Sequence, residues 1–290
     1  MILKLAAEFR PMVWGSENWV ISGYGERETR VAEGPLAGKT LNEVYGEQFP
    51  LLIKFIDAHD DLSLQVHPDD ALAAKRGIGL GKTEMWYVMN DGGHLLVGLK
   101  EKITPDSYAQ LVRDNRLVDV LERHDTSKGD IFFLPAGRIH AICGGTVLCE
   151  IQETSDNTYR IYDYGRKDQD GNPRELHHKE AREVLDFTSL SDYRTHYTTQ
   201  ANKPSRLAAC QYFSTEILDL SQTTELDVTP LDSFCILICV DGEAEVDQRD
   251  GLQPQTARLK KGHTLLLPAN ATNVMLTPLS SSKLLQVWVP

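Results

Sequence analysis

The sequence of 290 residues lacks features that mark several large classes of protein. It contains no run of lysine and arginine, and its formal net charge of -12 gives it no basic surface of the kind that attracts nucleic acid. It also has no stretch of about eighteen consecutive apolar residues, which a helix needs to span a membrane. The sequence therefore predicts a protein with neither a nucleic-acid nor a membrane partner.

Cysteine is scarce, and its spacing argues against a disulfide framework. The five cysteines are odd in number and include no Cys-x-x-Cys pair. The amino-terminal residues lack the apolar core and the small-residue cleavage site of a secretory signal. These observations predict a cytoplasmic protein whose cysteines are structural thiols.

Short apolar runs between Gly, Asp, Asn and Pro residues dominate the chain and predict a mainly β protein. Only three segments indicate helices, at Pro68–Lys75, at Thr104 to about Arg123, and at His178–Phe187, because of their starting residues or apolar spacing. Six runs have the length of strands, and these are 51–56, 62–66, 85–89, 95–97, 131–134 and 147–151.

An internal repeat indicates two β domains of similar construction. The pattern Gly-x5-Pro-x-Gly-x2-His at 129–140 matches Gly-x5-Pro-x-Asn-x2-Asn at 262–273, and a strand ending in an Asp-Gly turn precedes each copy. The first copy is longer by about the length of the predicted helix at 104–123. We therefore expect a larger domain over 1–200 with this helical insertion, and a smaller one over 201–290.

Four side chains suited to a divalent metal lie near the predicted strands. Gln65 and His67 alternate in a strand-like segment, so their side chains share a face. Glu84 lies at the next strand, and His140 follows the Pro-x-Gly turn. Two imidazoles, a carboxylate and a neutral oxygen suit a Lewis-acid metal; zinc is favoured, and spacing alone leaves manganese, iron and cobalt open. The second copy has Asn273 in place of His140, so only the first domain is predicted to bind metal.

The Gly-x5-Pro-x-Gly-x2-His pattern resembles a signature of the cupin family, whose small jelly-roll barrels hold a metal near the barrel mouth. Other motifs narrow the resemblance, because Gln-Val-His-Pro and Ser-Asp-Asn-x-x-Arg form a specific combination. The chain is similar to the type I mannose-6-phosphate isomerase family in its short bacterial form. The stretches that carry this similarity are 9–15, 34–41, 65–70, 82–87 and 136–160.

The resemblance implies two cupin-type jelly-roll barrels, a phosphorylated hexose substrate and one zinc ion per chain. The implied reaction is the reversible interconversion of mannose 6-phosphate and fructose 6-phosphate. It also implies Gln65, His67, Glu84 and His140 as metal ligands, and Arg160 as an active-site residue. The sequence departs from the family in having Thr83 where many relatives have Pro, and in its lack of room for a large helical domain.

The chemistry of an aldose–ketose isomerase indicates further candidates. A proton must leave the carbon next to the carbonyl and return to its neighbour through an enediolate, which a divalent ion can stabilise. Lys82 shares a strand face with Glu84 and can act as a proton shuttle or bind an anion. The fork of Arg160 suits a phosphate or an enediolate oxygen. Glu150 and Asp156 can each be the base, and the sequence does not choose between them.

Two other functions fit the same scaffold, because a fold does not fix a function. One is a non-catalytic cupin that binds or senses a sugar phosphate without turnover. The other is a metal-dependent cupin oxygenase, which Gln65 disfavours because it stands where such enzymes carry a histidine. Both a monomer and a homodimer are compatible with the sequence.

Overall fold

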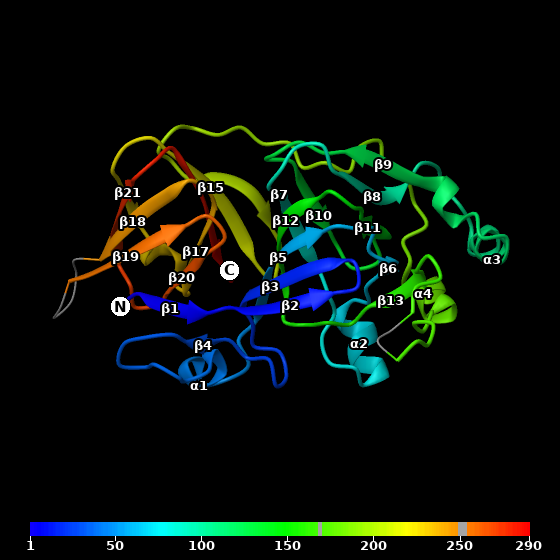
Figure 1. Cartoon of the computed structure of the whole chain (residues 1–290), viewed down its shortest axis with the longest axis horizontal. Helices are drawn as coiled ribbons and strands as arrows, with labels where there is room; N and C mark the ends of the chain where they lie inside the picture. Colours follow the sequence, from blue (N-terminus) through cyan, green and yellow to red (C-terminus); the bar gives the residue numbers. More distant parts are fainter. Residues whose placement is uncertain (168–169, 249–253) are drawn as a thin grey trace. The chain divides into compact units, whose positions relative to one another are not determined.

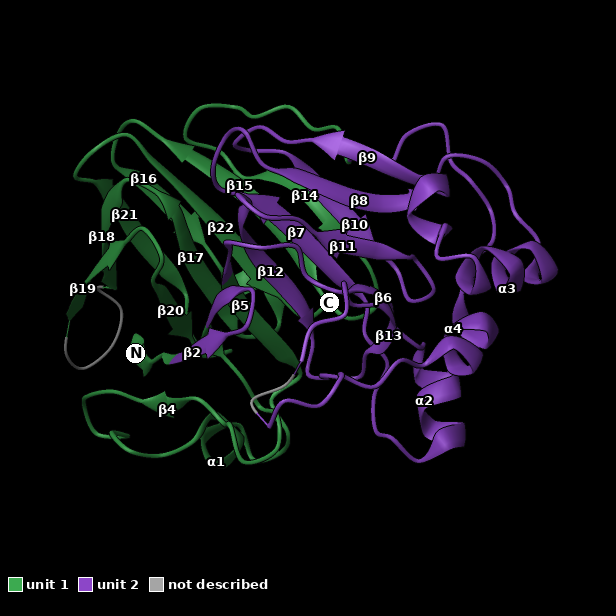
Figure 2. Ribbon diagram, turned by 45° about the vertical axis from the view of Figure 1, so that its right-hand side comes forward, with its two compact units in different colours: residues 1–8, 18–55, 195–290 green, residues 9–17, 56–194 purple. Residues whose placement is uncertain are grey.

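The computed structural model describes residues 1–167, 170–248 and 254–290, and strands dominate it, as predicted (Figure 1). Contacts divide the chain into two compact units (Figure 2). Unit 1 comprises 1–8, 18–55 and 195–290, and unit 2 comprises 9–17 and 56–194. The expected domains 1–200 and 201–290 stay a prediction, and the units differ from them in placing 18–55 with the carboxy-terminal strands. No helix in the described ranges has the length and apolar character needed to cross a bilayer.

Unit 1 contains a seven-stranded and a four-stranded antiparallel sheet. Its elements are β1 (Leu3–Ala6), β4 (Arg30–Val31), α1 (Leu41–Tyr45), β14 (Ser205–Ala209), β15 (Ser214–Leu220), β16 (Thr224–Asp227), the 3-10 turn η2 (Thr229–Leu231), β17 (Cys235–Asp241), β18 (Glu243–Gln248), β19 (Gln255–Lys260), β20 (Thr264–Leu267), β21 (Asn273–Pro278) and β22 (Ser282–Trp288). The strand orders are β14-β15-β22-β17-β20-β1-β4 and β16-β21-β18-β19.

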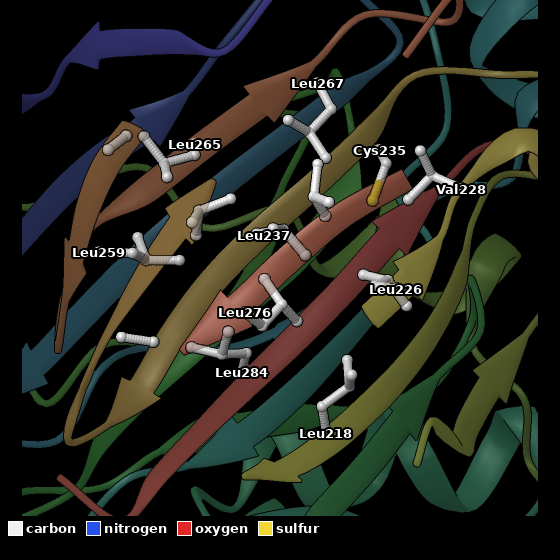
Figure 3. Close-up of a cluster of buried hydrophobic side chains, with 14 of the residues drawn as sticks. Leu218, Leu226, Val228, Cys235, Leu237, Leu259, Leu265, Leu267, Leu276 and Leu284 are labelled. Atoms are coloured by element: carbon white, nitrogen blue, oxygen red, sulfur yellow. The ribbon is translucent and has the colours of Figure 1, made fainter. Parts of the chain in front are cut away.

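The core of unit 1 lies between these two sheets, because alternate residues of each strand point inward. Cys235, Leu237 and Cys239 on β17 are buried with leucines of both sheets, several of which are labelled in Figure 3. Asn273 is exposed at the start of β21, where its Nδ2 donates a hydrogen bond of 2.7 Å to Glu225 Oε1.

Unit 2 is built around a five-stranded sheet in the order β13-β6-β11-β8-β9 and around the neighbouring strands β10-β7-β12 of another sheet. The unit boundaries fall in β2 (Glu8–Met12), β3 (Gly15–Ile21) and β5 (Leu51–Ala58). The other elements are β6 (Leu64–Val66), α2 (Asp70–Arg76), β7 (Glu84–Val88), β8 (His94–Leu99), α3 (Pro105–Arg113), the 3-10 turn η1 (Leu117–Val120), β9 (Leu121–Asp125), β10 (Ile131–Leu134), β11 (His140–Ile142), β12 (Val147–Glu153), β13 (Tyr159–Tyr162) and α4 (His178–Val184).

The two faces of the five-stranded sheet pack against different partners. Leu95 and Val97 on β8 join Trp86 and Phe132 in a cluster between the strands of the two sheets. The opposite face, which includes Leu96, packs against side chains from α3 and α4. Figures 1 and 2 show these two helices beside each other near β13.

The helix predicted from Thr104 to about Arg123 begins as expected and ends early. Thr104 caps the helix through a reciprocal pair of hydrogen bonds with Ser107. The helix ends at Arg113, since Asn115 adopts a left-handed conformation with φ of 55°, which asparagine tolerates well. Beyond η1 the chain forms β9, which pairs with β8, so the prediction of a helix to Arg123 was wrong.

The helices predicted at 68–75 and 178–187 are present with shifted ends. Asp69 is the N-cap of α2 and accepts a hydrogen bond from Leu72 N of 2.8 Å, so Pro68 lies before the helix. His177 is the N-cap residue of α4. Helix α4 ends at Val184, because Leu185 has the extended backbone with ψ of 128°.

Candidate metal centre

Strand pairing in the five-stranded sheet aligns three of the predicted site residues. Gln65 on β6 lies opposite His140 on β11 and opposite Arg160 on β13. Directly paired residues project from the same face of a sheet. The three side chains therefore form a row on the face that points toward β7 and β12.

Residues of β7 and β12 complete the site from the other sheet. Glu84 begins β7, and Trp86 follows two residues later on the same face. The Trp86 ring contacts His140 edge to face, with 5.2 Å between ring centroids. Its indole Nε1 donates a hydrogen bond of 3.0 Å to Glu150 Oε1 on β12.

The predicted ligands His67, Glu84 and His140 converge on one buried point. One ligand atom from each lies within 4.8 Å of the others, and none of the three residues is more than 2% exposed. His140 Nε2 lies 3.1 Å from His67 Nε2 and 3.3 Å from Glu84 Oε1. Gln65 Nε2 lies 3.3 Å from His140 Nε2, so a half-turn of this amide would bring its oxygen to the same point.

The hydrogen bonds of the two imidazoles fit a bound cation. His67 Nδ1 lies 2.8 Å from the carbonyl of Asn157, and His140 Nδ1 lies 2.8 Å from the carbonyl of Arg138. Since a carbonyl only accepts, each Nδ1 carries a proton and donates it. Burial and the charge of Lys82 lower the pKa of His140 to about 3, so its ring is neutral at pH 7. The two Nε2 atoms, 3.1 Å apart, are the ring atoms that would bind a metal, and zinc accepts such histidine, carboxylate and amide donors.

The cation of Lys82 lies directly beside these ligands. Its Nζ is 2.9 Å from Glu84 Oε2 and 3.4 Å from His67 Nε2, and the residue is 3% exposed. A buried carboxylate is costly unless a positive charge accompanies it. Lys82 therefore offsets part of the charge of Glu84.

Arg160 is half-buried at the end of the residue row. Its Nη1 donates a hydrogen bond of 3.1 Å to the carbonyl of Glu175, while its Nε has no hydrogen-bond partner among the described residues. Burial and the nearby charge of Arg174 lower the pKa of Arg160. The guanidinium thus supplies positive charge next to Gln65, and its expected role in binding an anion stays a prediction.

The two carboxylates that the sequence left as alternatives occupy different environments. Glu150 is buried and holds Trp86. Asp156 is exposed on the segment between β12 and β13, close enough for its charge to oppose, in part, the lowering of the Arg160 pKa by burial. Of these two carboxylates, Glu150 is the buried one, and it contacts the Trp86 ring that packs against His140.

The structure adds residues that sequence reasoning did not single out as site residues. Asn157 was noted as part of a motif, and its carbonyl proves to orient His67. Glu153 Oε1 accepts a hydrogen bond of 2.6 Å from Thr83 N, between Lys82 and Glu84. Nothing in the local sequence indicates the role of Glu153, because its partner is far away in the chain.

Two family models and several curated proteins match the chain. Residues 17–97 match the family described as phosphomannose isomerase type I, catalytic domain, and 204–279 match mannose-6-phosphate isomerase, cupin domain. Mannose-6-phosphate isomerase ManA of Bacillus subtilis is 33% identical over 268 residues, which cover 87% of this chain and 83% of that protein. Mannose-6-phosphate isomerase of Streptococcus mutans is 31% identical, with 87% and 82% covered. A shorter match, 39% identical over 193 residues, spans 62% of this chain and 61% of the GmuF protein of B. subtilis.

Solved structures share the fold over the whole chain. The crystal structure of mannose 6-phosphate isomerase from B. subtilis has a TM-score of 0.89 at 28% identity, with 99% of both chains covered. A zinc-bound mannose 6-phosphate isomerase has a TM-score of 0.78 at 16% identity, which shows the common fold. The fold and the buried His–Glu–His cluster thus define a cupin-type protein with a candidate metal centre. The chain belongs to the mannose-6-phosphate isomerase family.

The raised pKa of Glu153 predicts that the stability of the protein depends on pH. It is hydrogen-bonded to Asp70, whose Oδ1 in turn accepts a hydrogen bond of 2.7 Å from Gly81 N. Burial raises the pKa of Glu153 from 4.5 to about 7. Between these values the folded state binds more protons than the unfolded state, so this residue makes the free energy of unfolding fall as pH rises.

We expect Glu153→Gln to flatten this fall, because the amide oxygen still accepts from Thr83 and the amide nitrogen can donate to Asp70. Urea unfolding at several pH values between 4.5 and 7 would measure the slope. Glu175→Gln, at a side chain 84% exposed, is the matched control and should keep the wild-type slope. An unchanged slope in Glu153→Gln would contradict the assignment.

Proposed function

We propose that the chain is a zinc-dependent isomerase that interconverts mannose 6-phosphate and fructose 6-phosphate. Its family membership supports the reaction, and the observation that carries the proposal is the convergence of two imidazoles and a carboxylate beside Gln65. Gln65, His67, Glu84 and His140 are the ligands that would hold one zinc ion at this centre. When bound, the ion supplies a Lewis acid that polarises an oxygen of the open-chain sugar.

We assign the proton transfer to Lys82. Its amine lies next to the ligand atoms and therefore next to the substrate carbons that would bind there. Once the ammonium group has given its proton to solvent, the neutral amine can take a proton from the carbon beside the carbonyl and return it to the adjacent carbon. In this assignment Glu150 positions the Trp86 ring by accepting its hydrogen bond, and the exposed Asp156 contributes negative charge near Arg160. These two carboxylates are the alternative bases.

We assign the phosphate to Arg160, because a half-buried guanidinium in an acidic protein provides the local positive charge that a sugar phosphate needs. Its place in the row with Gln65 and His140 supports a phosphate position at one side of the metal centre. Binding energy from this remote group helps to hold the reacting carbons in place.

The protein is proposed to act in the cytoplasm, because all five cysteines are free, as in proteins of a reducing compartment. Whether it is a monomer or a homodimer stays a prediction, which light scattering would resolve.

The first test is conversion of mannose 6-phosphate to fructose 6-phosphate by the purified protein. Activity should disappear on chelation and return with zinc, and His140→Ala should lose metal and activity together. His263→Ala, at an exposed histidine of the other unit, is the control. Substrate binding without turnover by zinc-loaded protein would support the non-catalytic cupin instead, and oxygen consumption would support the oxygenase.

Arg160→Ala should lower kcat/KM by at least about 100-fold, since it removes charge-assisted hydrogen bonds to a doubly charged phosphate. The bound zinc should remain, because Arg160 is not one of the ligands. Metal analysis and steady-state kinetics on the same sample would measure both. Arg116→Ala, at a side chain 67% exposed, is the matched control. Loss of zinc in Arg160→Ala would indicate a structural role.

Lys82→Met should lower kcat by about 10²–10⁴, the usual contribution of a general acid or base. Glu150→Gln keeps an acceptor for Trp86 and should retain most of kcat, as should Asp156→Asn. Kinetics across pH with zinc content measured for each variant would compare them. The opposite ranking, with Glu150→Gln or Asp156→Asn the most impaired, would identify that carboxylate as the base.

A further inference from the structure

A second cluster of metal-ligating side chains lies on the other face of the five-stranded sheet. One ligand atom each from Asp61, His94 and Cys143 lies within 4.8 Å of the others. Side chains alternate along β11, so His140 faces the metal centre, while Cys143 belongs to the hydrophobic cluster beneath α3 and α4. Cys143 follows His140 by three residues, which corresponds to about 10 Å along a strand.

The three side chains come from separate segments that backbone hydrogen bonds hold together. Asp61 lies between β5 and β6, His94 begins β8, and Cys143 follows β11. Cys143 N donates a hydrogen bond of 3.2 Å to the carbonyl of His94, and Gly144 N donates one of 2.8 Å to Asp61 Oδ1. These hydrogen bonds fix the positions of Asp61, His94 and Cys143 relative to one another.

The Asp61 carboxylate accepts hydrogen bonds from several groups of the cluster. The Cys143 thiol and the Tyr164 hydroxyl both hydrogen-bond to this carboxylate. Cys143 is 1% exposed, whereas Asp61 and His94 are half-buried. A buried sulfur and two partly accessible ligands leave an open side through which an ion could enter.

The cations near the cluster are matched by carboxylates of their own. Arg123 forms an ion pair with Asp125 at 3.1 Å, and Arg166 forms one with Asp163 at 2.6 Å. Arg166 also donates to the backbone carbonyl of Asp61, which leaves the Asp61 side chain to its other partners. A divalent cation bound by a thiolate, a carboxylate and a neutral imidazole would carry no net charge.

We propose that Asp61, His94 and Cys143 form a second zinc site, with water in the fourth position. Zinc binds sulfur at about 2.3 Å and nitrogen or oxygen at about 2.0–2.2 Å, which places tetrahedral ligands roughly 3.5 Å apart. The side chains would close by about 1 Å to reach this geometry. The mixed sulfur, nitrogen and oxygen donors favour zinc over magnesium or calcium, which prefer oxygen alone.

Binding at this site releases one proton. Burial and the charge of Asp61 raise the pKa of the Cys143 thiol to about 12, so the group is protonated at neutral pH. On binding, the S–H bond breaks, its electron pair forms the bond to zinc, and the proton leaves to solvent. Burial lowers the pKa of His94, whose ring is then already neutral. The affinity should therefore rise about tenfold per pH unit near neutrality.

Titration of metal-free protein with zinc tests the site. Wild type should bind two equivalents, while Cys143→Ser and His94→Gln should bind one. His94→Gln changes a partly exposed position and leaves the buried cysteine in place. His59→Gln and Asp60→Asn, at exposed neighbours of the cluster, are matched controls and should bind two.

Cadmium, a zinc analogue that binds thiolate strongly, provides a signal specific to this site. Its thiolate charge-transfer absorption should appear in wild type and in His140→Ala, and be absent from Cys143→Ser. The centre at His140 contains no sulfur ligand and cannot produce this band. Equal zinc stoichiometry in wild type and Cys143→Ser, or a band that survives in Cys143→Ser, would overturn the proposal. The result is independent of isomerase activity.

Discussion

The main constraint on unit 2 is that its interior holds several electron-rich ligand atoms close together. Two imidazole Nε2 atoms lie 3.1 Å apart, and a buried carboxylate lies within 3.3 Å of one of them. Their lone pairs and charge repel unless a cation lies among them. Lys82 supplies one positive charge at the edge of this group, and a divalent ion would supply the rest. The strands must therefore resist a repulsion that the bound ion would turn into attraction.

That resistance comes from partners around the ligands. Backbone carbonyls fix both histidine rings, and Trp86 packs edge to face against one of them. Glu153 and Asp70 hold the backbone at 81–83, which leads into Glu84. A site carried by strands and braced in this way keeps its geometry better than a site on free loops.

The sequence indicated the candidate ligands because each lies in a short motif with its own local meaning. Strand alternation paired Gln65 with His67, and the turn before β11 identified His140. Glu153 could not be found this way, since its contact with Thr83 joins distant segments and leaves no local pattern. The same limit explains the error at Arg123. The apolar spacing around Leu121 fits a helix, but pairing of β9 with β8 decides the structure.

Strand β11 shows how alternation lets a three-residue strand serve two different environments. His140 points toward the acceptor-rich centre, and Cys143, just past the strand end, belongs to the opposite face. Burial acts on both groups in the direction that removes charge, lowering the pKa of the imidazole and raising that of the thiol. The imidazole then offers a lone pair at once, whereas the thiol must first lose its proton. The two proposed sites would thus lie on opposite faces of one strand, and the chemistry of each face would set the conditions under which a metal binds there.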